Sequence, residues 1–185
     1  MGIFSKLFGA KDGAPAVKDY SFIADIAALI TDNDSKVVSK LCECASEPWG
    51  YAEKNAERYL QRGIVVSDRK SNDIDDICWI GMVDELSENG YLFAVDCSDD
   101  GENILWGLSQ LKNNGLIEKY TDGFETDDDD DAETFLHKLN SALKGACICM
   151  IDIDSDSYEL IIASLDVYQK ISAIAKNNGY SIITL

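Results

Sequence analysis

The chain has 185 residues, of which 46% are hydrophobic, and its 34 Asp and Glu outnumber its 16 Lys and Arg to give a formal net charge of −18. This charge argues against nucleic acid and anionic lipid as partners, because proteins bind both of them through Lys and Arg. The remaining explanations for the negative charge are a basic protein partner, a bound cation, or a role in solubility alone.

The first 18 residues differ in composition from the rest of the chain. Residues 1–9 are apolar and weakly basic, and residues 9–18 are small, polar and broken by Gly and Pro. We expect an N-terminal arm and linker at 1–18 and a single domain at 19–185. The arm is either a frayed terminus or a short amphipathic contact with a membrane or another protein.

Neither a signal peptide nor a transmembrane segment is expected. The start lacks the long apolar stretch of a signal peptide, and no apolar run approaches the ~20 residues of a membrane-spanning helix. We therefore expect a cytoplasmic protein whose six cysteines are free thiols. Cys42 with Cys44, and Cys147 with Cys149, form C-x-C pairs. Zinc sites usually use C-x-x-C spacing, so buried thiols are the plainer interpretation.

The first part of the domain is predicted to be helical. Phe22, Ile23, Ile26 and Ile30 recur at helical spacing, and two further helices are expected at about 35–47 and 51–61. The β-branched residues 64–66 that follow Gly63 predict a short edge strand.

A repeated junction of helix and strand dominates the middle and the end of the chain. Helices at 74–88, 101–112 and 165–176 each end in an Asn-Gly or Asn-Asn-Gly sequence, which tolerates the left-handed conformation that closes a helix. Apolar residues follow each stop and indicate strands, notably at 91–96 and 180–184.

The C-terminal part predicts a β-hairpin. Residues 146–153 and 158–163 are apolar and flank Asp154-Ser155-Asp156-Ser157, which is typical of a turn. The whole pattern predicts an α+β fold, in which N-terminal helices precede a mixed sheet of about four strands with helices packed on it. A C-terminal hairpin, helix and strand complete it.

The acidic residues are most concentrated within the C-terminal half of the chain. Residues 121–160 contain twelve carboxylates and only two lysines, Lys138 and Lys144. The densest run is the candidate surface for a basic partner: Asp127, Asp128, Asp129, Asp130 and Asp131. A solvated loop is the plainer interpretation of such a run, since packed like charges resist burial.

The three tryptophans divide into core and surface candidates. Trp79 and Trp106 lie within apolar runs, so both are expected in the core. Trp49 follows Pro48 at a helix boundary and has the best case for exposure among the aromatic residues, so it joins the partner-binding candidates. Core packing is nevertheless the plainer interpretation for Trp49 too, since large aromatic residues are usually mostly buried.

A weak calcium site is the metal hypothesis. Asp152, Asp154 and Asp156 form D-x-D-x-D, which resembles the opening of a calcium loop. Ser157 then stands where such a loop has Gly, and Ala163 where it has a bidentate Glu. Calcium is therefore a minor hypothesis, and no other cofactor is indicated.

Enzymatic activity has little support from motifs. His137 is the one histidine, it falls on the polar side of its helix, and no nucleophile motif or phosphate-binding loop accompanies it. Carboxylate-only hydrolysis or small-ligand binding through Asp152, Asp154 or Asp96 stays open as an alternative.

One resemblance extends over residues 77–164. The segments 77–86, 90–91, 95–96 and 104–108, with 151–158 and the apolar strand after them, resemble a bacterial family described only as a domain of unknown function. The resemblance implies a bacterial, cytoplasmic, α+β protein and brings no catalytic residues. Separately, the excess of carboxylates in residues 121–160 leads us to expect a protein-binding module, similar in action to an immunity protein or antitoxin that neutralises a basic partner.

Overall fold

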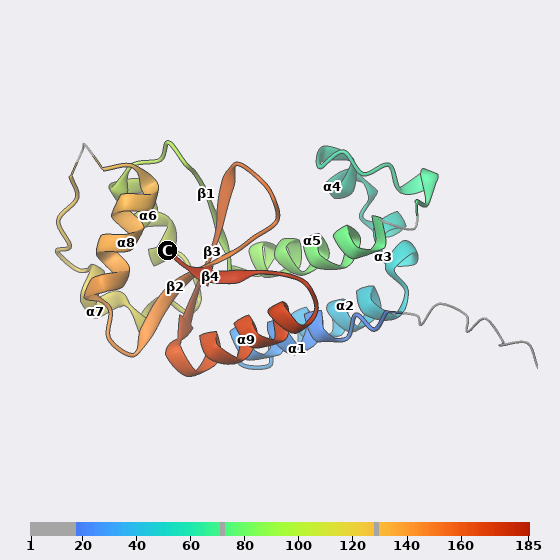
Figure 1. Ribbon diagram of the computed structural model, residues 1–185, viewed down its shortest axis with the longest axis horizontal. Coiled ribbons are helices and arrows are strands. Elements are labelled where there is room, and N and C mark those ends of the chain that lie inside the picture. Colours follow the sequence, from blue (N-terminus) through green and yellow to red (C-terminus); the bar gives the residue numbers. More distant parts are fainter. Residues whose placement is uncertain (1–17, 71–72, 128–129) are drawn as a thin grey trace, which may run out of the picture.

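A computed structural model describes residues 18–70, 73–127 and 130–185. The predicted arm and linker, except for residue 18, lie outside the described residues. Helices fill the first part of the described chain, and most of the four-stranded sheet comes from its last third (Figure 1). The predicted α+β class, with its terminal hairpin, helix and strand, is confirmed.

The sheet contains β1 (Phe93–Asp96), β2 (Ala146–Ile151), β3 (Ser157–Ser164) and β4 (Ile182–Thr184) in the order β1-β3-β2-β4. β2 and β3 form the predicted hairpin. The predicted mixed pairing is corrected, because all three strand pairs are antiparallel. Helix α9 (Leu165–Asn177) connects β3 to β4. These two strands run in the same direction, and β2 lies between them in the sheet.

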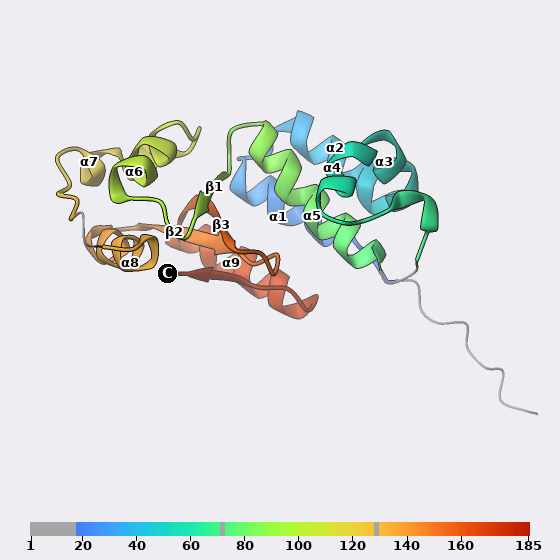
Figure 2. The same ribbon diagram turned by 90° about the horizontal axis from the view of Figure 1, so that it is seen from above.

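Helices lie on both sides of the sheet (Figures 1 and 2). On one side are α1 (Phe22–Ile30), α5 (Asp73–Glu88) and α9, with α2 (Ser35–Ser46), α3 (Pro48–Lys54) and α4 (Ala56–Gln61) packed against them. On the other side are α6 (Gly101–Ser109), the short α7 (Glu118–Thr121) and α8 (Ala132–Ala142). The sheet therefore separates two hydrophobic cores.

The alternation of side chains along the strands supplies both cores. On β3, Ile161 and Ala163 enter the core under α1 and α9, while Leu160 and Ile162 enter the core under α6 and α8. Successive strand residues point to opposite faces, so a strand covered on both faces is apolar nearly throughout. This explains why β2 and β3 appear in the sequence as continuous apolar runs.

Helix ends follow the predicted chemistry. Asp34, Asp100, Asp131 and Ser164 each accept a hydrogen bond from a backbone N–H of the helix that they precede. At the predicted stops after α5 and α9, Gly90 and Gly179 have φ values of 74° and 86°, which favour glycine.

Two predicted strand segments are wrong. Residues 64–65 are irregular and Val66 begins a short 3₁₀ helix (Val66–Asp68). The apolar residues after the Asn-Asn-Gly stop lie in and just after another 3₁₀ helix (Asn114–Leu116). The second segment packs against β3, but both edges of β3 are already paired, with β1 and β2, so it cannot join the sheet there.

The tryptophan predictions are half right. Trp79 is 3% exposed, as expected for the core. Trp106 was predicted to be in the core and is 64% exposed, because α6 turns Ile104, Gly107 and Leu108 toward the sheet and leaves position 106 on the outer face. Trp49, for which core packing was the plainer interpretation, is partly buried against the core on the α1 side.

The cysteine interpretation agrees with the structure for most positions. Cys44, Cys78, Cys147 and Cys149 are buried, whereas Cys42 and Cys97 are exposed, and all six are free. Among the described residues, no helix is long and apolar enough to cross a membrane.

Candidate functional site

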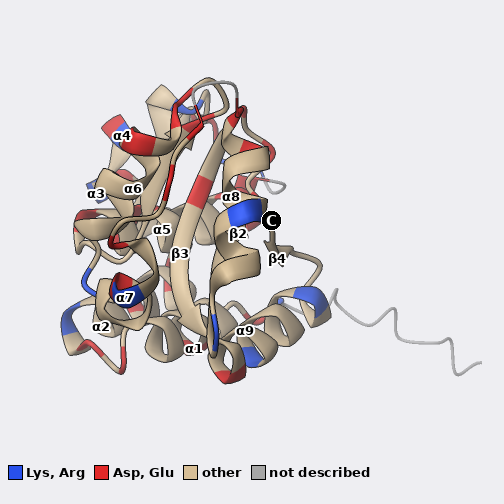
Figure 3. Ribbon diagram, turned by 90° about the vertical axis from the view of Figure 1, so that its left-hand side faces the viewer, with Lys and Arg blue, Asp and Glu red and all other residues tan. Residues whose placement is uncertain are grey.

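Three acidic segments meet at one end of the sheet. They are the β1–α6 loop, the start of α8 with the residues before it, and the turn of the β2–β3 hairpin. Asp96 lies opposite Ser157 across the β1–β3 pair. The pKa of the neighbouring Tyr158 hydroxyl is raised mainly by burial, and the nearby Glu133, Cys97 and Asp131 raise it further. We call residues 96–102, 127, 130–133 and 152–156 the acidic end. Figure 3 shows acidic residues in red around the start of α8, which is one of its three segments.

Several of these carboxylates have local structural roles. Asp100 and Asp131 cap α6 and α8 by accepting from the N–H of Asn103 and Thr134, each at 2.8 Å. Asp96 accepts from the N–H and the hydroxyl of Ser98 at 2.8 and 2.6 Å. Hydrogen bonds to the charged form lower the pKa of a carboxyl, and the pKa values of Asp96 and Asp131 lie below the ordinary value for this reason. Both groups are therefore ionised at neutral pH.

The predicted aspartate run is only partly available to a partner. Asp130 forms an ion pair with Lys138 at 2.6 Å, and Asp131 is the α8 cap. Asp128 and Asp129 lie outside the described residues. Local contacts thus account for Asp130 and Asp131, and the structure adds the β1–α6 loop and the hairpin turn to the acidic surface that the sequence predicted. Trp49 lies on α3, apart from the acidic end.

The predicted calcium residues do not form a cluster of ligands. Asp152 accepts from the N–H of Asp154 at 3.0 Å, and Asp154 has a φ of 55°, which places it in the turn. Among the described residues, no group of three or more His, Cys, Asp or Glu side chains could hold a metal ion.

Asp152 and Asp154 do line a cavity, which has a volume of about 340 Å³. It lies between the N-terminal half of α5, the hairpin and the turn from α9 to β4. Its wall consists of nine residues: Asp76, Trp79, Ile80, Asp152, Ile153, Asp154, Gly179, Tyr180 and Ser181.

Aromatic rings form the rigid part of this cavity. The rings of Trp79 and Tyr180 are stacked, with centroids 4.3 Å apart and planes 18° apart. The indole N–H of Trp79 donates to the backbone carbonyl of Asp152 at 2.7 Å and so fixes the hairpin against α5. The Tyr180 hydroxyl donates to the carbonyl of Asp75 at 3.1 Å.

Asp76 is the carboxylate of this cavity that the sequence did not single out. Burial, followed by the charges of Asp73 and Asp75, raises its pKa. It forms no hydrogen bond or ion pair with any described residue. The sequence signal is the acidic start of α5, residues 73–76, although only the fold brings it beside the hairpin.

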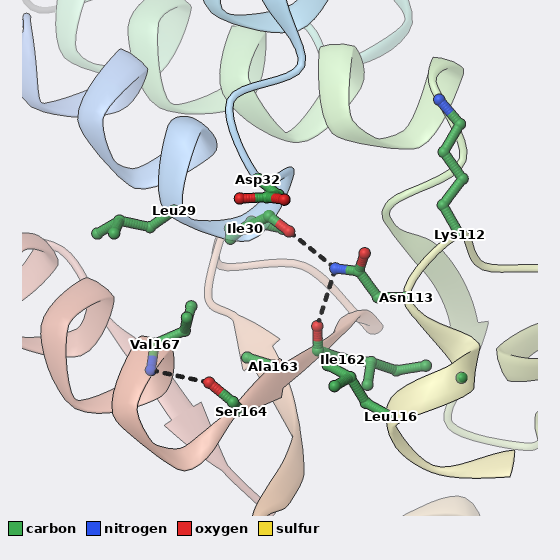
Figure 4. Close-up of a pocket in the computed structure, with 11 residues that line it drawn as sticks. Leu29, Ile30, Asp32, Lys112, Asn113, Leu116, Ile162, Ala163, Ser164 and Val167 are labelled. Atoms are coloured by element: carbon green, nitrogen blue, oxygen red, sulfur yellow. Dashed lines mark hydrogen bonds between the residues drawn. The ribbon is translucent and has the colours of Figure 1, made fainter.

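A larger cavity, of about 440 Å³, lies between α1, β3 and the start of α9 (Figure 4). Three of its polar side chains, those of Asn113, Ser164 and Lys112, form contacts within the protein. The Asn113 amide donates to the carbonyls of Ile30 at 2.8 Å and Ile162 at 3.2 Å. Ser164 caps α9, and the Lys112 ammonium points away toward Asp34 and the ring of Tyr91. These contacts make this cavity a structural junction of helices and sheet.

Taken together, the fold and these surfaces define an α+β domain with an acidic sheet end and an adjoining acidic, aromatic cavity. The chain belongs to the family described as Domain of unknown function (DUF6630), whose model matches residues 22–185. This confirms the predicted kind of family and extends it well beyond residues 77–164. No curated protein and no solved structure matches the chain.

Proposed function

We propose that this protein is a protein-binding module that recognises a basic partner through its acidic end. The observation that carries this proposal is the meeting of three acidic segments, far apart in the sequence, at one end of the sheet. Complementary charge speeds the encounter of two proteins and disfavours partners of like charge. Neutralisation of a basic toxin, in the manner of an immunity protein or an antitoxin, is the specific form of this function that the charge fits.

The local hydrogen bonds of the acidic end support the proposal. A cap or turn bond fixes the position of a carboxylate without removing its charge, as for Asp96, Asp100 and Asp131. A partner then meets charges that are already ordered, so less conformational entropy is lost on binding.

The test is to remove three charges that have no part in capping. Glu102→Gln, Glu133→Gln and Asp156→Asn are exposed positions of the acidic end. The matched control is Asp25→Asn, Glu47→Gln and Glu57→Gln, which removes the same charge from exposed sites on α1, before α3 and on α4. The probe is a ten-residue lysine peptide, and a ten-residue glutamate peptide is the negative control.

We expect the acidic-end variant to associate with the lysine peptide several-fold more slowly and to show a weaker dependence on salt, because steering acts through local potential. The control variant should behave as the parent does. If the two variants lose association rate equally, net charge alone explains the binding and the acidic end is not the recognition surface.

The alternative of a carboxylate-based hydrolase or small-ligand binder finds one supporting feature, which is the cavity lined by Asp76, Asp152 and Asp154. Asp96, the third acid predicted for such a role, is held in a turn by Ser98 and has a lowered pKa. A general acid needs a raised pKa, so the surroundings of Asp96 disfavour that role.

A further inference from the structure

The cavity beside the hairpin combines negative charge with aromatic surface. Three carboxylates, from Asp76, Asp152 and Asp154, line it from two separate parts of the chain, and no lysine or arginine is among its lining residues. The stacked rings of Trp79 and Tyr180 supply the apolar wall. Carboxylates attract a cation, and aromatic faces attract it further while they accommodate an alkyl stem.

The molecule itself shows this chemistry next to the cavity. The Lys18 ammonium lies 2.5 Å from the Asp75 carboxylate and 5.0 Å from the ring centroid of Tyr180, the same ring that lines the cavity. It lies 5.3 Å from the ring of Tyr20. An aromatic ring and an acid from the first turn of α5 therefore hold one alkylammonium group already. Asp76 and Tyr180 offer the same pair of groups one residue along α5.

The position and size of the cavity match a side chain of a docked protein. Asp154 belongs both to the cavity and to the acidic end, so a partner bound at the acidic end is brought to the cavity mouth. A volume of about 340 Å³ is near the lower limit of ligand cavities, roughly 300 Å³, which suits a single long side chain better than a large metabolite.

We infer that this cavity is a specificity pocket that receives one lysine or arginine side chain of the basic partner, with the cationic head among Asp76, Asp152 and Asp154 and the alkyl stem against Trp79 and Tyr180. The inference rests on the proposed function and names the feature that the partner must present. Charge at the acidic end brings the partner near, and the pocket selects a partner with a basic side chain at the right place.

The test uses the indole N–H of Trp79 as a reporter, in ¹⁵N-labelled full-length protein. The probe is Nα-acetyl-lysine methylamide, and Nα-acetyl-norleucine methylamide is its uncharged counterpart. We expect the lysine probe to shift the Trp79 indole signal saturably, because this group lies at the cavity wall and bonds the Asp152 carbonyl. The Trp106 signal should not move, and the norleucine probe should have little effect on either.

Variants assign the effect to the cavity. Asp76→Asn and Asp154→Asn should each weaken binding of the lysine probe by about threefold, the effect of losing one accessible ion pair. Asn also tolerates the positive φ of Asp154, so the turn is retained. Glu57→Gln, at an exposed position on α4 outside both the cavity and the acidic end, is the control and should leave affinity for the probe unchanged. Equal losses in all three variants, or an unmoved Trp79 signal, would overturn the inference.

Failure of this inference is separable from failure of the proposed function. If the lysine peptide still binds the acidic end with its salt dependence while the Trp79 signal does not shift, the proposed function is supported and the specificity pocket is rejected. If the small probe binds with a Trp79 shift but the acidic-end charges prove irrelevant to the peptide, the cavity takes free amines, and its assignment to a protein partner is wrong.

Discussion

Buried acids are the main departure from simple expectation at the scale of single residues. Glu85 is 5% exposed and accepts from Tyr51 and Arg58. Glu159 is 4% exposed on β3, and the Asp84 side chain on α5 is 13% exposed. Arg62 donates to one oxygen of Asp84 at 2.8 Å, while the other oxygen has no hydrogen-bond partner among the described residues. Burial raises the pKa of the Asp84 and Glu159 carboxyls, and the Asp84 charge raises that of Glu159 further. Nothing in the sequence distinguishes these buried acids from the rest of the 34 Asp and Glu residues.

Asp84→Asn should stabilise the fold increasingly as pH rises. A carboxyl whose folded-state pKa is raised favours the folded state at low pH, and this contribution is lost as pH rises through the folded pKa. Asn cannot ionise and keeps an oxygen for Arg62. The gain at pH 8 should be on the order of 1 kcal/mol, the usual cost of a buried polar group without a partner. Urea unfolding at pH 4, 6 and 8 measures it. A stability difference that does not change with pH would contradict this account.

At the scale of secondary-structure elements, local chemistry was predicted better than pairing. The helix stops at Gly90 and Gly179 were predicted, because they follow from residue types whose conformational preferences are intrinsic. The strand order β1-β3-β2-β4 does not follow from residue types, because it depends on how the faces of the strands are divided between the two hydrophobic cores. For the same reason, the outward position of Trp106 needed the orientation of α6 relative to the sheet.

Asn113 illustrates the difference between a local and a tertiary role. Its sequence context predicted a helix stop, yet its amide joins the carbonyl of Ile30 at the end of α1 to that of Ile162 on β3. The neighbouring Asn114 bonds only the Ser109 carbonyl within its own turn. Asn113→Ala should therefore cost about 1 to 2 kcal/mol, because two carbonyls lose a donor, and the matched control Asn114→Ala should cost less. Thermal unfolding of both variants measures the two losses of stability. A larger loss for Asn114→Ala than for Asn113→Ala would show that the hydrogen bonds from Asn113 to Ile30 and Ile162 are not important for stability.

At the scale of the whole molecule, the sequence predicted the fold class and the acidic character but only part of the candidate site. Asp152 and Asp154 were singled out as calcium ligands or, alternatively, as small-ligand-binding residues, and the fold places them in a cavity with Asp76 and Tyr180. Residue 76 is separated from the hairpin by more than 70 positions, and Tyr180 lies in a turn on the far side of it in sequence. No spacing rule connects such positions. Only the packing of α5 and α9 against the sheet brings them together.

The net charge of −18 has a consequence for the stability of the entire chain. The described ion pairs, such as Lys138 with Asp130 and Arg62 with Asp84, leave a large excess of carboxylates that repel one another in the folded state. Added salt screens attraction and repulsion alike, with a Debye length of about 10 Å at 0.1 M, and here repulsion is in excess. The melting temperature should therefore rise by several degrees between 10 mM and 300 mM sodium chloride.

Choline chloride should have the same effect at equal ionic strength, because screening does not depend on the identity of the cation. A rise with sodium alone would instead indicate a specific cation site, and a fall with either salt would mean that the attractive pairs outweigh the repulsion.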